Sequence, residues 1–442
     1  MSTDNITIIE PLAGPLDGTT RVPGDKSISH RAILFSAMAE GTTRVSGVLD
    51  SDDVRSSIKA VQKLGAEVNL TKAIDGSLEG GITGWGASGP KQPDGPIDCG
   101  NSGTTARLLM GVLAPWDIKV TLTGDDSLTK RPMRRITAPL MKMGVNFEPA
   151  GRETLPITVV GDSGLHPIDY EAPMSSAQLK TAVLLAGLYA DGTTTVSEPS
   201  PSRNHTELML PEYGADTTAG YRTASVNGPC QLKACEVLVP GDPSSASFLV
   251  CAAVLKPGSN IQIENVSLNT ARTGFVRTLE RMGANIDTRI TGYAGKEAYG
   301  VISAAYSPNL LGCEIPAQHI ASEIDEIPVL AITAAFARGI TVFRGVGELK
   351  VKESNRLQAV IQVLNEIGID AWEEGEDLFI QGQPGLKVPQ GLVIDSRKDH
   401  RLAMTWSILG LCGDKEIGIR DFDAVKVSFP TFRAQFEELV QQ

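Results

Sequence analysis

The residues best suited to chemistry in this sequence are basic and hydroxyl side chains that stand directly before long apolar segments. Residues 23–31 read PGDKSISHR and precede an apolar run that ends at Gly41. A helix that begins here carries unpaired N–H groups and a partial positive charge at its N-terminus. Lys26, Ser27 and Arg31 add further donors beside them. This stretch therefore predicts a binding site for an anion.

Similar polar stretches precede five other apolar runs. Helix capping explains their Ser and Asp residues, but it does not explain why Arg107, Gln178 and Arg401 also lie within a turn or two of the start. If the buried helices of each domain run parallel, their N-termini gather, and two such ends that face each other would form a cleft for a ligand with several anionic groups. The five stretches are GNSGTTAR at 100–107, MSSAQ at 174–178, GDPSS at 241–245, DEIP at 325–328 and KDHR at 398–401.

The elements that must position these residues form an internal repeat. In each unit a capped, nearly all-apolar helix ends near a Gly, a Thr/Val-rich strand follows, and an amphipathic helix ends the pattern. A helix that is apolar all round is buried, whereas one with a polar face lies outside. The buried helices are predicted at 27–39, 103–113, 176–189, 244–255, 328–337 and 400–411, the strands at 42–45, 119–123, 192–196, 261–263, 339–342 and 416–419, and the outer helices at 54–64, 133–144, 207–214, 276–283, 357–368 and 432–439.

Six units in 442 residues are too many for one core and predict two α/β domains of three units each. We expect one domain over 21–239 and a second that combines 1–20 with 240–442. The sixth unit lacks a following strand, so the N-terminal strand near 5–11 is expected to complete it. The chain would then cross between the domains near 20 and near 239, and these crossings would act as hinges.

Composition and charge exclude several classes of protein. A net charge of −12 argues against a general nucleic-acid binder, and no apolar run approaches the roughly 18 residues of a membrane span. The six cysteines form no C-x-x-C pair, and the five histidines show no ligand spacing. We therefore expect reduced thiols, a cytoplasmic location, no metal and no membrane contact. We also expect a monomer.

Six motifs, in order along nearly the whole chain, resemble the 5-enolpyruvylshikimate-3-phosphate (EPSP) synthase family. They are PGDKSISHRA from 23, GNSGTTARLL from 100, RPM from 131, SSAQLKTA from 175, VKESNRL from 351 and DHRLAM from 399. The resemblance implies a two-domain inside-out α/β barrel, with three repeated βαβαββ-type units and buried parallel helices in each domain. This agrees with the repeat deduced from the residues alone.

The resemblance also implies the activity, that of a 3-phosphoshikimate 1-carboxyvinyltransferase of the shikimate pathway, which leads to chorismate and the aromatic amino acids. Shikimate 3-phosphate and phosphoenolpyruvate would give the 5-enolpyruvyl ether and phosphate without a cofactor. The 5-hydroxyl adds to C2 of the enolpyruvyl group while C3 is protonated, and phosphate then leaves as C3 loses a proton. Both substrates are polyanions, which accounts for a cationic site on an acidic protein.

The site residues implied by the matching motifs fall into three groups. For catalysis these are Asp325 near the 5-hydroxyl, Lys352 bonded to it, Glu353 near the methylene carbon, and Lys26. Shikimate 3-phosphate would be bound by Lys26, Ser27, Arg31, Ser175, Ser176, Ala177, Gln178, Arg203, Asp325 and Lys352. Phosphoenolpyruvate would be bound by Lys26, Asn101, Gly103, Arg131, Gln178, Arg356 and Arg401.

Three assignments stay open at this point. Asp325 and Glu326 both precede Pro328 and could simply cap a helix, and either could be the functional carboxylate. His400 could bind substrate or only brace Arg401. Many family members have a Lys at the position of Val427, so a substrate contact of the neighbouring Lys426 is an open question.

Gly103 bears on inhibition by glyphosate. Family members that resist this inhibitor often have Ala at this position, whose methyl group intrudes on it. The stretches GDDSLTKRPM and SRNHTE look more like the bacterial branch known for weak inhibition. We nevertheless expect appreciable inhibition, because the residue here is Gly103.

Two rival functions remain. A UDP-N-acetylglucosamine enolpyruvyl transferase shares the fold but usually carries a reactive Cys in a loop that here, over 122–133, has none. A non-catalytic phosphate-binding protein of the same fold would keep the helix caps and lose the catalytic side chains, which are all present. The P-loop pattern G-x-x-x-x-G-K-[ST] does not occur.

Overall fold

The computed structural model describes residues 5–441. The chain forms two compact units. Unit 1 comprises Met1–Pro23, Gly241–Gly292 and Ala298–Gln442, and unit 2 comprises Gly24–Pro240 and Tyr293–Glu297. The last of these segments is the tip of a hairpin whose strands belong to unit 1, and the sequence analysis had assigned it to the other domain.

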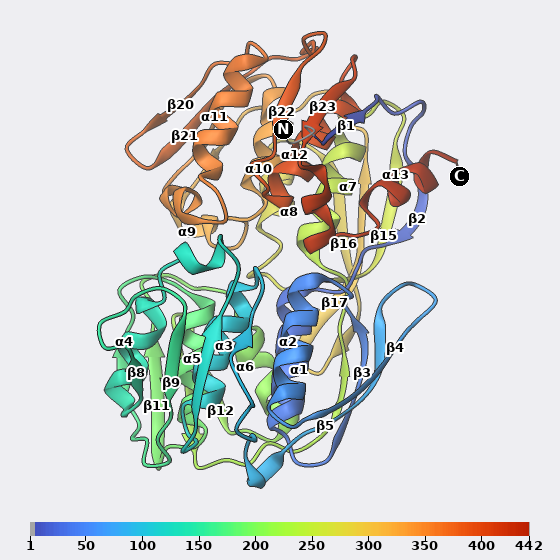
Figure 1. Cartoon of the computed structure of the whole chain (residues 1–442). Coiled ribbons are helices and arrows are strands. Elements are labelled where there is room, and N and C mark those ends of the chain that lie inside the picture. The colour runs from blue at the N-terminus through green and yellow to red at the C-terminus, as the bar shows by residue number, and fades with distance from the viewer. Residues whose placement is uncertain (1–4, 442) are drawn as a thin grey trace. The chain divides into compact units, whose positions relative to one another are not determined.

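Unit 2, which is coloured from blue to yellow-green in Figure 1, contains three four-stranded sheets that share one strand order. In each sheet the first strand pairs parallel with the second, and the other two pair antiparallel. The first sheet contains β14 (Glu236–Leu238), β3 (Thr42–Val48), β5 (Leu78–Thr83) and β4 (Glu67–Lys72), the second β6 (Ile97–Asp98), β7 (Lys119–Thr123), β9 (Ile157–Val160) and β8 (Asn146–Glu148), and the third β10 (Asp169–Glu171), β11 (Gly192–Ser197), β13 (Thr223–Gly228) and β12 (Thr217–Ala219).

Three buried helices form the centre of unit 2, and α3 packs against both of the others. Each begins at a side chain that accepts a backbone N–H of its first turn: Asp25 from Ile28, Ser102 from Thr105, and Ser176 from Leu179. The buried helices are α1 (Lys26–Met38), α3 (Gly103–Leu113) and α5 (Ala177–Gly187), and the outer helices are α2 (Asp52–Lys63), α4 (Arg134–Met143) and α6 (His205–Met209).

The starts of these three helices meet, as the sequence predicted. Arg31 on the second turn of α1 donates to the Thr181 hydroxyl of α5 over 2.8 Å. The Gln178 amide of α5 donates to Thr104 of α3 over 3.0 Å. The capping residues and cations of the three motifs are therefore gathered at one end of the helices.

Unit 1 repeats this plan with one difference. Within residues 5–441, two of its sheets have four strands in the same order and the third has three, in which β1 pairs antiparallel with β23. The sheets are β2 (Asp17–Arg21), β15 (Asn260–Ser267), β17 (Glu297–Ala305) and β16 (Asn285–Ala294); β18 (Glu314–Ile315), β19 (Gly339–Phe343), β21 (Asp377–Gly382) and β20 (Ala371–Glu374); and β22 (Val393–Asp395), β23 (Ile417–Arg420) and β1 (Ile6–Ile9).

The buried helices of unit 1 pack against one another in all three pairs. Their starts also meet, because Ser244 on the first turn of α7 donates to Glu326 at the start of α10 and lies 3.4 Å from Arg401 of α12. The buried helices are α7 (Pro243–Leu255), α10 (Ile327–Ala335) and α12 (His400–Cys412), and the others are α8 (Gly274–Arg281), α9 (Ala317–Ile320), α11 (Arg356–Glu366) and α13 (Phe432–Gln441).

The predicted α/β class and its repeated units are confirmed, and the third unit shows the clearest departure. An outer helix was expected over 207–214, but α6 ends at Met209 and a 3₁₀ turn, Leu210–Tyr213, follows. Pro211 supplies no backbone N–H, so the α-helical hydrogen bonds cannot continue through it. The 3₁₀ turn instead ends at the capping residue Gly214, which adopts a positive φ of 85°.

Candidate active site

The predicted site residues of unit 2 lie at the starts of its buried helices or in the loops beside them. We call this set the unit 2 cluster. Its members are Lys26, Ser27, Arg31, Asn101, Gly103, Arg131, Ser175, Ser176, Ala177, Gln178 and Arg203.

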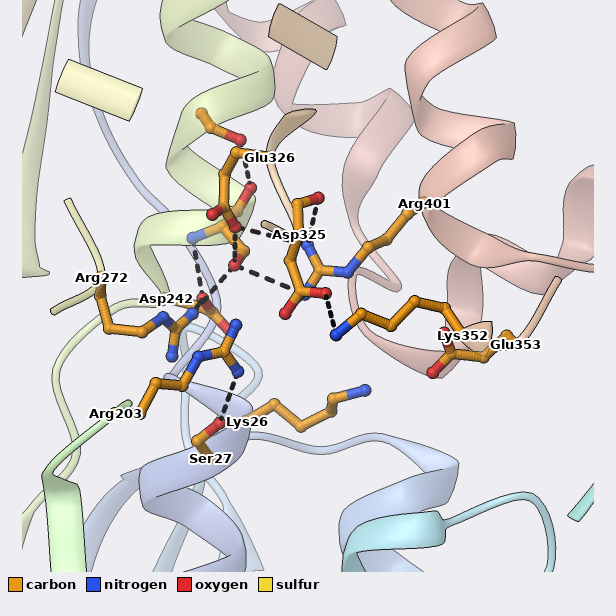
Figure 2. Close-up of polar contacts among 12 residues, drawn as sticks. Lys26, Ser27, Arg203, Asp242, Arg272, Asp325, Glu326, Lys352, Glu353 and Arg401 are labelled. Carbon is orange, nitrogen blue, oxygen red and sulfur yellow. Dashed lines mark hydrogen bonds and ion pairs between the residues drawn. The ribbon is translucent and has the colours of Figure 1, made fainter. Parts of the chain in front are cut away.

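Lys26 is the first residue of α1, and a carboxylate orients its side chain. The Nζ atom lies 3.0 Å from Oδ2 of Asp53 on the first turn of α2, and both side chains are largely buried. At the next residue of α1, the hydroxyl of Ser27 accepts a hydrogen bond from the Arg203 guanidinium over 3.4 Å (Figure 2). The start of α1 thus carries an ammonium group whose direction is fixed by α2.

Arg31 is buried and joins three helices. Its guanidinium donates to the Ser27 carbonyl over 3.0 Å, to the Thr181 hydroxyl over 2.8 Å and to the Thr206 hydroxyl over 2.8 Å. These contacts fix the planar group within α1, α5 and α6. The positive charge is therefore held in one place beside the helix starts.

Gln178 is oriented by two arginines. Its Oε1 accepts from Arg107 over 3.1 Å and from Arg135 over 3.2 Å, and its amide donates to Thr104. The sequence analysis noted Arg107 as an unusual helix-start cation but did not place it in the site, and it missed Arg135. The Arg-Arg pair that directly follows RPM was the available signal for Arg135.

Arg131 is held by the loop that precedes it. Its guanidinium donates to the Asn101 side chain over 2.7 Å and to the Ser127 hydroxyl over 3.0 Å. Asn101 in turn donates to Asp125 over 2.7 Å, and Asp125 accepts the backbone N–H of Ser127 and of Leu128. A closed hydrogen-bonded loop thus fixes the cation beside the start of α3.

A buried chain of hydroxyl groups lies beneath these residues. His30 Nδ1 is 2.8 Å from the Ser57 hydroxyl, which is 2.8 Å from Thr105, whose hydroxyl donates to Ser102 over 2.8 Å. Burial lowers the pKa of His30 to about 3, so this imidazole is neutral at pH 7. His30 therefore links α1, α2 and α3 as an uncharged group and adds nothing to the positive charge of the site.

The predicted site residues of unit 1 surround one arginine. We define the unit 1 cluster as Asp325, Lys352, Glu353, Arg356 and Arg401. The guanidinium of Arg356 lies 2.9 Å from Asp399, 3.1 Å from Asp325 and 2.5 Å from Glu353. Burial alone would lower the pKa of Arg356, but these three carboxylates raise it above its ordinary value.

The geometry separates Asp325 from Glu326 (Figure 2). Asp325 lies 3.8 Å from Lys352 and 3.6 Å from Arg401, and its side chain is 12% exposed. Glu326 is 1% exposed, accepts a hydrogen bond from Ser244 and lies 3.5 Å from Arg401. Glu326 stands at the N-cap position of α10, but its side chain makes no capping hydrogen bond there. Asp325 is therefore the more accessible carboxylate, and Glu326 orients Arg401.

Two supporting residues in unit 1, Arg272 and Glu348, were missed by the sequence analysis. Arg272 is buried and donates to Asp242 over 2.8 Å and to Ser244 over 2.9 Å, so it holds the start of α7 (Figure 2). Glu348 accepts from Lys352 over 2.6 Å. Arg272 and Glu348 stand outside the repeated motifs, and no local pattern marked them.

The roles of His400 and Lys426 were also left open by the sequence, and the structure defines the surroundings of both residues. His400 is buried at the start of α12. Lys426 is exposed in a 3₁₀ turn, and its Nζ lies 2.7 Å from Asp423. A surface ion pair of this kind is a sufficient role for Lys426.

A buried carboxyl beside the unit 1 cluster leads to a stability prediction. Glu323 accepts from the Thr278 hydroxyl over 2.7 Å, while its Oε1 has no hydrogen-bond partner among residues 5–441. Burial raises the pKa of Glu323 to about 7, and the charge of Glu326 acts in the same direction. Because the folded pKa exceeds that of the unfolded chain, this group stabilises the fold at acid pH, and that contribution is lost as pH rises through about 7.

Glu323→Gln is therefore expected to flatten the pH dependence of stability. The free energy of unfolding of the variant, measured relative to that of the wild type, should rise by up to roughly 3 kcal/mol from about pH 5 to pH 9. Urea unfolding at both pH values measures this difference. Equal pH dependence in the two proteins would show that Glu323 does not titrate in this range.

Within the described residues, no helix is long and apolar enough to cross a membrane, and no group of three His, Cys, Asp or Glu side chains could hold a metal ion.

Comparisons with known proteins agree on one family. The model of the family described as EPSP synthase (3-phosphoshikimate 1-carboxyvinyltransferase) matches residues 12–436. A 3-phosphoshikimate 1-carboxyvinyltransferase from Brucella abortus is 43% identical over 422 residues, which cover 94% of this chain and 92% of the relative. One from a Ruegeria species is 43% identical over 435 residues, which cover 97% and 95%.

Solved structures show the same likeness. An EPSP synthase from Acinetobacter baumannii superposes with a TM-score of 0.87 at 38% identity and covers 98% of both chains. The enolpyruvyl transferase NikO from Streptomyces tendae superposes with a TM-score of 0.78 at 17% identity, over 99% of this chain and 98% of its own. The second likeness shows the fold alone.

Proposed function

The chain belongs to the EPSP synthase family, and from this premise we propose that it transfers the enolpyruvyl group of phosphoenolpyruvate to the 5-hydroxyl of shikimate 3-phosphate. The products are 5-enolpyruvylshikimate 3-phosphate and inorganic phosphate. The observation that best supports this proposal is the unit 1 cluster, in which the Asp325 carboxylate lies within 4 Å of three cations. Such a group can accept a proton while neighbouring cations stabilise negative charge.

We assign the cations to the anionic groups of the two substrates. Lys26, Arg131, Arg356 and Arg401 would bind phosphoenolpyruvate, together with Asn101, Gly103 and Gln178. Shikimate 3-phosphate would be bound by Lys26, Ser27, Arg31, Arg203, Asp325, Lys352 and the residues from Ser175 to Gln178. Guanidinium groups pair with carboxylate and phosphate through two hydrogen bonds, so the arginines would fix orientation as well as charge.

The chemistry then needs two proton carriers. Asp325, assisted by Lys352, would take the proton of the 5-hydroxyl while the hydroxyl oxygen forms a bond to C2 of phosphoenolpyruvate. Glu353 would deliver a proton to C3, which forms the methyl group of a tetrahedral intermediate. When the C2–O bond to phosphate breaks, Glu353 would take one proton back from C3 and restore the double bond. The cations would stabilise the departing phosphate.

Phosphate release with different acceptors tests this proposal. We expect release from phosphoenolpyruvate with shikimate 3-phosphate and none with UDP-N-acetylglucosamine. Release with the sugar nucleotide alone would make the other enolpyruvyl transferase activity correct. No release with either acceptor would favour a non-catalytic phosphate-binding protein. A monomeric state and a cytoplasmic location belong to the same proposal.

Inhibition by glyphosate is a separate expectation, and the variant Gly103→Ala provides the control for it. A Cβ atom at this position would lie 2.7 Å from Nη1 of Arg107 and 3.4 Å from Nη1 of Arg131. Arg107 is buried and bonded to Gln178, so Gly103→Ala would displace groups that we assign to phosphoenolpyruvate.

We therefore expect glyphosate to inhibit the wild type in competition with phosphoenolpyruvate. Gly103→Ala should weaken that inhibition at least tenfold and raise the KM for phosphoenolpyruvate severalfold, in line with a perturbation of one or two charged contacts. Initial rates at low phosphoenolpyruvate measure both. Activity of the wild type that is intact in millimolar glyphosate would contradict the expectation.

A further inference from the structure

Three charged side chains that the proposed reaction does not use lie buried together in unit 2. Nζ of Lys180 is 2.9 Å from Glu198 and 2.7 Å from Glu207. The three side chains are 6%, 1% and 4% exposed, in that order. Burying charged groups is costly even when they are paired, and an ion pair of this kind adds little stability over well-packed apolar residues. A role beyond stability would account for its presence.

Glu198 connects this ion cluster to the start of α5. Its Oε1 accepts the backbone N–H of Ser176 over 2.7 Å, and its Oε2 accepts the hydroxyl of Ser202 over 2.8 Å. Ser176 is the capping residue of α5 and is assigned to shikimate 3-phosphate. The carboxylate therefore fixes a substrate residue through the backbone, while Lys180 on the next turn of the same helix fixes the carboxylate.

A second set of contacts docks the following loop on the same helix start. The Ser175 hydroxyl donates to the Ser200 carbonyl over 2.6 Å and accepts the Ser200 backbone N–H over 3.0 Å. Residues 198–202 are thus held at both Ser175 and Ser176. Arg203 is the next residue along the chain, and it reaches the Ser27 hydroxyl.

Glu207 is the second carboxylate that pairs with Lys180. It lies on α6 beside Thr206, which accepts a hydrogen bond from Arg31. Lys180 therefore contacts carboxylates both before and after Arg203 in the sequence. Of these two carboxylates, that of Glu198 also accepts hydrogen bonds from Ser176 and Ser202.

We propose that Glu198 is a positioning residue for shikimate 3-phosphate, held in place by Lys180. It sets the spacing between Ser175 and Ser176 on one side and Arg203 on the other. The inference rests on the proposed function for the identity of the ligand. The buried contacts on which the inference depends all lie within unit 2.

The two glutamates form a matched pair for a test. Glu198→Gln and Glu207→Gln each remove one carboxylate from Lys180, so both should lower thermal stability to a similar extent. Only Glu198→Gln also changes the group that contacts Ser176 and Ser202. We expect it to raise the KM for shikimate 3-phosphate about tenfold, the effect of weakening one or two charged hydrogen bonds, while the KM for phosphoenolpyruvate and kcat change less than threefold.

Glu207→Gln should leave the KM for shikimate 3-phosphate within threefold of the wild type. Equal changes in both Michaelis constants, or the same change in both variants, would overturn the proposal. If Glu198→Gln does not fold, Ser202→Ala takes its place, because it removes one hydrogen bond to Glu198 and keeps all three charges. It is expected to raise the same KM about threefold, and an unchanged KM would overturn the proposal.

Amide hydrogen exchange separates this inference from the proposed function. Exchange at 175–178 and 198–203 should be faster in Glu198→Gln than in Glu207→Gln, whatever the substrate is. If the wild type does not use shikimate 3-phosphate but this exchange pattern holds, the proposed function fails and the positioning role of Glu198 stands. If the wild type turns over and the exchange patterns are equal, only the positioning role fails.

Discussion

Lys26→Met should lower kcat about a thousandfold and leave the fold intact. The Nζ atom of Lys26 stands at the start of α1, 3.0 Å from Asp53, and methionine keeps the length of the side chain without its charge. Removal of one preorganised donor to a developing anion typically costs a hundredfold to a thousandfold. Lys26 is expected at the upper end because it is assigned to both substrates.

Steady-state phosphate release measures this effect, and Lys59→Met provides the control. Lys59 lies on the exposed face of α2, the helix that carries Asp53, and its replacement should change kcat less than twofold. Circular dichroism of the Lys26 variant should match the wild type. A loss in kcat of less than tenfold for Lys26→Met would remove this lysine from the proposed chemistry.

Arg356→Met should lower both stability and activity, because three acidic side chains converge on this guanidinium. Asp399, Asp325 and Glu353 all lie within 3.2 Å of it, and Arg356 itself is 1% exposed. Removing one partner from a buried charged group costs about 3–5 kcal/mol, because it leaves buried charge uncompensated. The free energy of unfolding should fall by that amount, and turnover should fall at least a hundredfold.

Arg356→Lys distinguishes charge from geometry. It restores a positive charge but cannot make the forked contacts with Asp399, so it should recover much of the stability and little of the activity. Arg433→Met, on the exposed face of α13, should change the free energy of unfolding by less than about 0.5 kcal/mol. Urea unfolding and initial rates measure the series. Full activity in the lysine variant would contradict the assigned role of the guanidinium.

The repeat could be predicted from the sequence because the signals that mark each unit lie within a short stretch of residues. Apolar helices such as α7 are buried all round, and their caps and terminal glycines stand within a few residues of them. Helix ends that depend on distant packing were harder to place. α6 ends early because of a single residue, Pro211, which lies inside the helix that the sequence predicted over 207–214.

The parts of the site that could be predicted were those that the motifs contain. Lys26, Arg131 and Arg356 are recognisable because their neighbours in sequence are distinctive. Their partners are not, because partners such as Asp53 and Asp399 come from other elements of the chain. The choice between Asp325 and Glu326 likewise needed three dimensions, since the two residues are adjacent in sequence and differ in which way they face.

Glu198 illustrates the same limit. It directly follows β11 and lies in no motif, and only the fold brings it to Ser176 and Lys180. A buried Lys near the end of SSAQLK gave a weak signal, because a lysine on an apolar helix needs a carboxylate partner. The sequence did not show which carboxylate that would be.

The central claim is that enolpyruvyl transfer proceeds by addition and elimination at C2, with C3 gaining and losing a proton. Turnover of phosphoenolpyruvate and shikimate 3-phosphate in D₂O, followed by proton NMR of the product, tests this most directly. We predict 5-enolpyruvylshikimate 3-phosphate with deuterium in its methylene group, together with one phosphate per product. The same product without any deuterium would mean that C3 is never protonated by a solvent-exchangeable group, and it would contradict the account.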